Sequence, residues 1–163
     1  MLDENYNILI EDILKNEEFQ KLESIEHHGT SRMKHSQRVS YYSYKICKKI
    51  HIDYISAARA GLLHDFFISP KERKKLERLK SVFTHPKKAL NQANEYFELN
   101  DIEQNIIVSH MFPLYLSLPQ YLESWVVSIV DKIVGTYEFL EKITLKHAYV
   151  PNIFVLAIIQ IFN

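Results

Sequence analysis

The sequence predicts an all-α fold, and three observations carry that prediction. The 163-residue chain has only three glycines and five prolines, and so few helix-breaking residues favour long helices over a turn-rich β-sandwich. Apolar residues recur at three- and four-residue steps in several segments, which is the spacing of an amphipathic helix. Residues that typically cap helices precede several of those segments. We therefore expect a compact bundle of about seven or eight helices and no sheet.

The composition limits the domain organisation and the kinds of partner. The length fits one domain, 1–163, around a single core, with the helices of residues 1–26 as an accessory to that core. Twenty basic and twenty acidic side chains cancel, which argues against a nucleic-acid or anionic-membrane partner. Cys47 is the only cysteine, so an intramolecular disulfide is excluded and a reducing compartment is favoured. Because the N-terminus is acidic and has no apolar signal core, we expect a cytoplasmic protein.

The first half of the chain contains three predicted helices and a predicted central one. Residues Glu4–Lys15 form an amphipathic pattern, and a second helix is expected around Glu17–Glu23, before a loop at 27–30. Ser31 is placed to cap a helix over Arg32–Ile50, and Asp53 to cap one from Tyr54 to about Asp65. The last of these is apolar or small on most sides, which predicts a central position. The expected apolar positions of the first and third helices are Ile8, Leu9, Ile13, Leu14, Val39, Tyr42, Ile46 and Ile50.

The second half begins with a basic run, Lys71–Lys80, that is expected to be an exposed segment or short helix. A cap residue followed by proline, Thr84-His85-Pro86, predicts a helix start and a helix to about Phe97. Asn100 begins a capping-box pattern for a helix that ends near His110. A long helix follows from Gln120 to about Lys142. Its expected core residues are Trp125, Val126, Ile129, Val130, Ile133 and Val134.

The most apolar stretch is the tail, Val150–Phe162. It is shorter than the roughly 20 residues that cross a bilayer. We expect a terminal helix over Pro151–Phe162 that closes the core, rather than a dimer face or a membrane-surface element, although a homodimer is left open.

Two aspartates are hard to explain in a purely structural core. Asp131 interrupts an apolar run in the long helix, and Asp65 directly follows the apolar run that ends at His64. A carboxylate buried without a counter-charge is very costly, so each needs a cation. Four histidines, His35, His64, His85 and His110, are expected near helix termini or in apolar surroundings. Imidazole and carboxylate together are suitable ligands for iron, manganese or zinc.

The order of these residues resembles that of a known family, the HD-domain superfamily of metal-dependent phosphohydrolases. The matching positions are the histidine in Arg32-Met33-Lys34-His35, the doublet in Leu62-Leu63-His64-Asp65 and the late aspartate in Val130-Asp131-Lys132. His85 and His110 match the two further histidines of members that hold two metals. The resemblance covers residues 32–132, most of the chain, and implies a compact HD-domain helical bundle.

The resemblance also implies roles for individual residues. His35, His64, Asp65 and Asp131 would hold a first metal, and Asp65 would bridge to a second metal held by His85 and His110. The implied cofactors are one or two divalent transition-metal ions, iron or manganese first, with zinc, nickel, cobalt or magnesium as alternatives. A water with its pKa lowered by the metals would be the nucleophile. Arg32 and Lys132 would join Asp65 in catalysis, and four residues would bind substrate: Arg32, Lys71, Lys132 and His28.

The function implied is hydrolysis of a phosphate ester or anhydride in a nucleotide or small phosphorylated metabolite. The glycine-tyrosine-proline signature of the cyclic dinucleotide phosphodiesterase branch is absent, and Ile68 stands where that branch places a lysine. This makes cyclic dinucleotides a less favoured substrate and leaves the general-acid or phosphate-binding role of that lysine unfilled, unless Lys71 or Lys132 supplies it. Two alternatives stay open: a di-iron oxygenase of the HD type, and a non-catalytic regulatory module that binds a nucleotide.

Overall fold

A computed structural model describes residues 4–27, 30–68 and 75–146 of the chain. Seven α-helices lie in these ranges, so the all-α prediction is confirmed. A single 3₁₀ turn and a two-residue antiparallel strand pair, where a loop was expected, are the only other regular elements there. In chain order the elements are α1 (Glu4–Lys15), α2 (Glu17–Gln20), η1 (Lys21–Ser24), β1 (Glu26–His27), β2 (Thr30–Ser31), α3 (Arg32–Lys49), α4 (Tyr54–Leu63), α5 (Lys75–Tyr96), α6 (Asp101–Ser109) and α7 (Leu122–Lys146).

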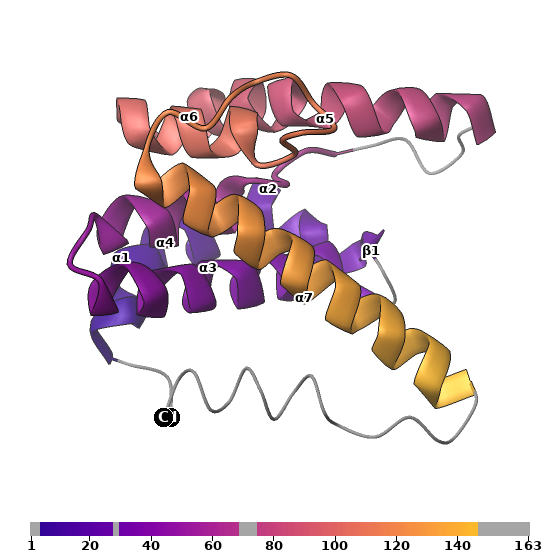
Figure 1. Cartoon of the computed structure of the whole chain (residues 1–163), viewed down its shortest axis with the longest axis horizontal. Helices are drawn as coiled ribbons and strands as arrows, with labels where there is room; N and C mark the ends of the chain where they lie inside the picture. The colour runs from indigo at the N-terminus through magenta and orange to yellow at the C-terminus, as the bar shows by residue number, and fades with distance from the viewer. Residues whose placement is uncertain (1–3, 28–29, 69–74, 147–163) are drawn as a thin grey trace.

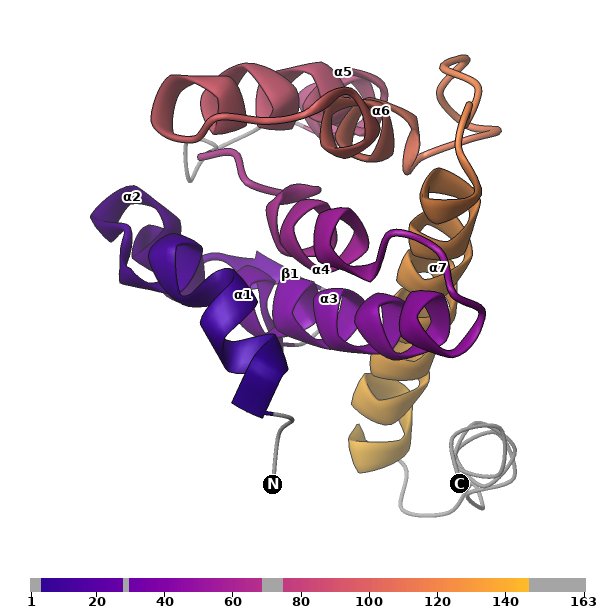
Figure 2. The ribbon, with the colours of Figure 1, turned by 90° about the vertical axis from the view of Figure 1, so that its left-hand side faces the viewer.

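Helix α4 occupies the centre of the bundle, as its apolar sequence predicted. It packs against α3, α6, α1, α7 and α5. Figure 1 shows α7 crossing in front of α3 and α4, with α5 and α6 forming a layer above them. In the perpendicular view of Figure 2, α1 and α2 lie on the side of α4 opposite α7. The C-terminal end of α4 is therefore surrounded by helices from both halves of the chain.

Side-chain caps fix where three of these helices begin. The Ser31 hydroxyl accepts a hydrogen bond from the Lys34 amide at 3.2 Å, which starts α3. The Asp53 carboxylate accepts two amide hydrogen bonds at the start of α4. Asn100 and Glu103 form the predicted capping box of α6. These caps satisfy amides that have no partner within the first turn of a helix, so each of the three starts is specified locally.

The prediction that a helix begins at Thr84 is wrong. Helix α5 starts at Lys75 and runs without interruption to Tyr96, with Pro86 inside it. A proline inside a helix removes one amide donor, and the remaining bonds of a 22-residue helix can maintain it. Because proline is also favoured in the first turn of a helix, the local sequence does not distinguish the two positions. Of the basic run, residues 71–74 lie outside the described part of the chain, and so does the predicted tail helix, Pro151–Phe162.

The expected apolar faces of α1 and α3 were only partly correct. In α1 the buried side chains are Tyr6, Ile10 and Ile13, whereas Ile8 is 67% exposed. In α3, Ile50 just beyond its end is 51% exposed. Three small polar residues of α3, Ser36, Ser40 and Ser43, are fully buried, and the Ser40 hydroxyl donates a hydrogen bond to the Ala58 carbonyl of α4 at 2.6 Å. No helix in the described ranges is both long enough and apolar enough to span a bilayer.

The small residues allow α3 and α4 to approach closely. A Cβ atom added at Gly61 of α4 would lie 3.0 Å from the Ser40 Cα and 3.4 Å from its amide nitrogen. Both are backbone atoms of α3, which cannot move aside as a flexible side chain can. The close spacing of the two helices therefore depends on the absence of a side chain at Gly61. The position of His64, three residues later, depends on the same spacing.

Gly61→Ala should lower the free energy of unfolding by about 1–3 kcal/mol, because the added Cβ forces two packed helices apart. Chemical denaturation followed by circular dichroism measures the change. Gly135→Ala, in the half-buried part of α7, is the matched control. There the substitution should leave stability unchanged or raise it, since alanine favours helix over glycine. Equal stability of the two variants would contradict the packing argument.

Candidate metal centre

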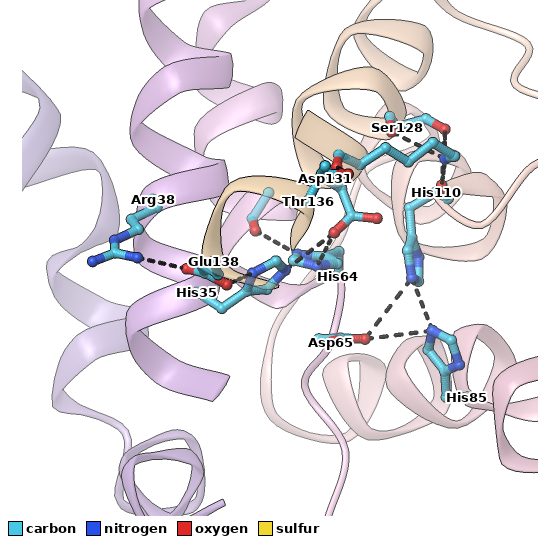
Figure 3. A network of polar contacts seen from close by, with 12 residues as sticks. His35, Arg38, His64, Asp65, His85, His110, Ser128, Asp131, Thr136 and Glu138 are labelled. Carbon is cyan, nitrogen blue, oxygen red and sulfur yellow. Dashed lines mark hydrogen bonds and ion pairs between the residues drawn. The ribbon is translucent and has the colours of Figure 1, made fainter. Parts of the chain in front are cut away.

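Five helices and the turn after α4 bring histidines and aspartates to one place inside the bundle (Figure 3). The cluster contains a histidine from the first turn of α3, residues that follow the C-terminal ends of α4 and α6, a histidine of α5 and an aspartate of α7. All six metal ligands proposed from the sequence are in this group. They are His35, His64, Asp65, His85, His110 and Asp131.

One half of the cluster is built around Asp131. The Nε2 atom of His35 lies 3.1 Å from its Oδ1, and the Nε2 atom of His64 lies 3.5 Å from the same oxygen. One ligand atom from each of these three residues lies within 4.8 Å of the others. Donor atoms held about 2.1 Å from one ion are about 3–3.5 Å apart, so the spacing suits a single metal.

The other half is built around Asp65. Its Oδ1 lies 3.5 Å from Nε2 of His85 and 3.8 Å from Nε2 of His110, and the two imidazole nitrogens are 3.1 Å apart. Asp65, His110 and His64 also form a group of donor atoms within 4.8 Å of one another. His64 thus belongs to both groups and stands between them. This arrangement provides donor atoms for two ions side by side.

The buried histidines are held so that Nε2 points to the centre. Nδ1–H of His64 donates to the Gly61 carbonyl at 2.8 Å, and Nδ1–H of His110 donates to the Ile107 carbonyl at 2.7 Å. Each histidine follows the last residue of its helix, where backbone carbonyls have no partner within the helix. Because Nδ1 carries the hydrogen, the lone pair of each neutral ring lies on Nε2 and is available to a metal.

His35 is oriented by a residue that was not predicted from the sequence, Glu138. Its Oε2 accepts a hydrogen bond from Nδ1–H of His35 at 2.8 Å, and its Oε1 is 2.9 Å from Nη1 of Arg38. Glu138 is only 2% exposed. It follows Asp131 by seven residues, which is two helical turns, so both carboxylates lie on one face of α7. That spacing was a usable signal, but Glu138 does not interrupt an apolar run as Asp131 does.

The pKa shifts reflect a site that favours positive charge near its carboxylates. Burial lowers the pKa of His35, but hydrogen bonds to Asp131 and Glu138 outweigh burial and raise it to about 10. Burial acts to raise the pKa of Asp131, yet its contacts with His35 and His64 hold it well below the usual value. His110 responds in the opposite direction, because burial and the neighbouring His64 lower its pKa to about 3.

The residues fit a metal by two further criteria. Nε2 of His64 is buried and makes no hydrogen bond to the part of the chain that the structure describes, which is costly for a polar atom unless another ligand binds it. The donor set is imidazole nitrogen and carboxylate oxygen, which suits iron, manganese or zinc. A centre of His35, His64 and Asp131 beside one of Asp65, His85 and His110 would hold one or two such ions.

Arg32 lies close to this cluster and is almost fully buried, at 7% exposed. Its Nη1 donates to the Phe67 carbonyl at 2.5 Å, and its guanidinium lies 3.9 Å from the centroid of the Phe67 ring. The same ring stacks on His85 with centroids 5.4 Å apart. The Phe67 ring therefore contacts both Arg32 and His85, and it forms part of the wall beside the second group of candidate ligands.

Lys132 has a different environment from the one that its proposed catalytic role suggested. Its ammonium donates to the His110 carbonyl at 2.9 Å, to the Ser128 carbonyl at 3.0 Å and to the Ser128 hydroxyl at 2.8 Å. In this structure it ties α7 to the turn that carries His110. The other two residues predicted to bind substrate, His28 and Lys71, lie outside the described residues.

Removing the carboxylate that orients His35 should weaken metal binding. We expect Glu138→Ala to raise the dissociation constant for Mn²⁺ or Zn²⁺ by about 10–100-fold, the usual cost of losing such a partner. Glu138→Gln, which retains a hydrogen-bond acceptor, should give a smaller loss. Glu141→Ala is the matched control, because this exposed acid of α7 only reaches 4.0 Å from Arg38. Competition with a chromophoric chelator measures the affinities, and equal values for the two alanine variants would contradict the assigned role.

Metal binding should release a proton from His35. In the metal-free protein its pKa is about 10, so the ring is protonated below that pH and must lose the Nε2 proton to bind a metal. Affinity should therefore rise by up to about tenfold per pH unit between pH 7.5 and 9. A histidine of ordinary pKa is already neutral there. Calorimetry in buffers of different ionisation enthalpy counts the released protons, and a flat affinity over this range would be evidence against a protonated His35.

Comparison with known proteins identifies the family of this chain. No curated protein and no solved structure gives a significant match. A family model described as "HD domain" matches residues 32–135, which is more than half of the chain and includes all six clustered ligands. The chain therefore belongs to the HD-domain family.

Proposed function

We propose that this protein is a metal-dependent phosphohydrolase that cleaves a phosphate ester or anhydride of a nucleotide or small phosphorylated metabolite. HD domains generally belong to a superfamily with this activity. The observation that carries the proposal is the orientation of the histidines. Nδ1 of His35, His64 and His110 is bound to an acceptor in each case, so that each Nε2 faces the carboxylate of Asp131 or Asp65.

The exposure of the ligands indicates from which side a substrate reaches the centre. His35, His64 and His110 are at most 1% exposed. The side chains of His85 and Asp131 are 12% and 13% exposed. A phosphate group would therefore approach along the side formed by these two residues, over the junction between the two groups of ligands.

Divalent ions at this centre would supply a water of lowered pKa and would polarise the phosphate oxygens. The protein's own residues provide what those ions require. Asp65 and Asp131 balance their charge, and Glu138 holds the ring of His35 from behind. Burial excludes bulk water from the inner histidines, which strengthens electrostatic interactions within the site.

Arg32 is the stronger of the two proposed phosphate-binding cations. Guanidinium binds two phosphate oxygens in a planar, bidentate geometry. Arg32 contacts the Phe67 ring that stacks on His85, one of the two more exposed residues of the centre, which supports a place for Arg32 on that side. Lys132 donates to backbone and hydroxyl oxygens of the His110 turn, which supports a role in holding that ligand. The general acid is not assigned.

A di-iron oxygenase uses the same kinds of ligand, and its chemistry needs dioxygen. The hydrolase proposal requires that a Mn²⁺-loaded protein hydrolyse phosphate esters under anaerobic conditions. Activity that appears only with iron and oxygen would favour the oxygenase. Tight nucleotide binding without turnover under any divalent metal would favour a regulatory module.

Substitution of the central ligands should remove metal and activity together. Asp65→Ala and His64→Ala should each lower bound metal, measured by plasma emission spectrometry, and hydrolysis of p-nitrophenyl phosphate or nucleotides by at least about 100-fold. Circular dichroism should show that the helices persist. His51→Asn, at an exposed histidine after α3, is the control and should retain both properties. Full activity in either ligand variant would refute the proposed function.

A further inference from the structure

Helix α7 exposes an apolar stripe on the side that faces away from the metal centre. Its members are large apolar residues at three-, four- and seven-residue steps, and each is 40–65% exposed. They are Leu122, Trp125, Ile129, Ile133, Leu140 and Ile143. A stripe of this length on a helix is the pattern of a packed face, not of isolated surface residues.

The stripe lies opposite the ligands on the same helix. Residues turn by about 100° each along a helix, so Ile133 is about 160° away from Asp131 around the α7 axis. The inward face of α7 carries Val127, Val134 and Glu138, all 5% exposed or less. A segment that covers the stripe would therefore support α7 without approaching the metal centre.

The chain itself contains a segment of matching chemistry directly after α7. Ten of the thirteen residues 150–162 are apolar, and none is charged. These residues follow Lys146, the last residue of α7, by a connection of a few residues, which is the usual length between antiparallel helices. A segment tethered so closely has an effective concentration of about 1 mM at the stripe, well above that of a second molecule at ordinary protein concentrations.

We propose that residues 151–162 dock on the C-terminal half of this stripe as an antiparallel helix. Twelve helical residues are about 18 Å long, which equals twelve residues of α7. Starting beside Ile143, the docked segment would cover Leu140 and extend to Ile133. Phe139, which is 53% exposed, adds apolar surface beside it. Leu122 and Trp125, about 27–31 Å from Ile143 along the helix, lie beyond its reach.

Disulfide trapping in the full-length chain tests this arrangement. Leu140→Cys is combined in turn with Phe154→Cys, Val155→Cys and Leu156→Cys, which samples the register. The native Cys47 is fully buried and can remain. Mild oxidation should give an intramolecular disulfide in at least one pair, seen by mass spectrometry as a loss of two hydrogens in the monomer. The matched control, Leu122→Cys with the same three partners, should give at least tenfold less.

Stability measurements provide a second test that does not depend on cysteine geometry. Leu156→Asp and Leu140→Asp should each lower the melting temperature, and their effects should not add, because both remove one interface. Leu156→Asp and Leu122→Asp should be additive. The emission maximum of Trp125, the only tryptophan, should not move in Leu156→Asp.

Three outcomes would overturn the proposal. If only intermolecular disulfides form, and the yield of the disulfide-linked dimer rises with protein concentration, a second copy of the chain covers the stripe. Co-sedimentation with phosphatidylglycerol vesicles, lost in Leu156→Asp, would show that the tail and stripe bind a membrane. Equal trapping from Leu140 and Leu122, or additive effects of Leu156→Asp and Leu140→Asp, would show that the segment has no defined site on α7.

Discussion

The position of two carboxylates inside the bundle, Asp65 buried and Asp131 largely buried, is the constraint on which the rest of the structure depends. Asp65 is 4% exposed and follows the most buried helix of the bundle, and Asp131 projects from α7 toward His35 and His64. Charges placed there are unfavourable without compensation. Compensation comes from helices far apart in the sequence, so the site and the packing of the bundle cannot be separated.

The ends of helices provide much of the orientation that this centre needs. At the C-terminus of a helix the last carbonyls lack intrahelical partners, and in α4 and α6 the histidine that follows the helix uses one of them. The same feature that ends the helix thus fixes which ring nitrogen faces the centre. His35 lies at the start of α3, where no such carbonyl is available. The Glu138 carboxylate accepts the Nδ1–H hydrogen bond of His35 instead.

The sequence was informative where the physical cause is local, and where burying a polar or charged side chain without a partner would cost much free energy. The caps at Ser31, Asp53 and Asn100 bind amides two or three residues away, so their effect does not depend on the rest of the fold. Asp65 and Asp131 stood out because a carboxylate in apolar surroundings needs a cation, and the family resemblance added the four histidines as candidate ligands. The spacing of Glu138 from Asp131 places both on one face of α7, but the partner of Glu138 and the anchoring contacts of Lys132 depend on which helix that face meets, which a single sequence does not specify.

Hydrophobic periodicity failed most clearly on α7, because the contacts of two carboxylates with His35 determine which face of this helix turns inward. The rule assigns the largest apolar residues to the core, which would turn Trp125, Ile129 and Ile133 inward, yet these residues are 40–53% exposed. The inward face must instead hold Asp131 and Glu138 against His35, with smaller residues between them. Both carboxylates contact the same imidazole, so a rotation of α7 that buried the larger apolar residues would carry both away from His35. The large apolar residues on the opposite side of α7 are consequently left at the surface, where they form the stripe on which we propose that residues 151–162 dock.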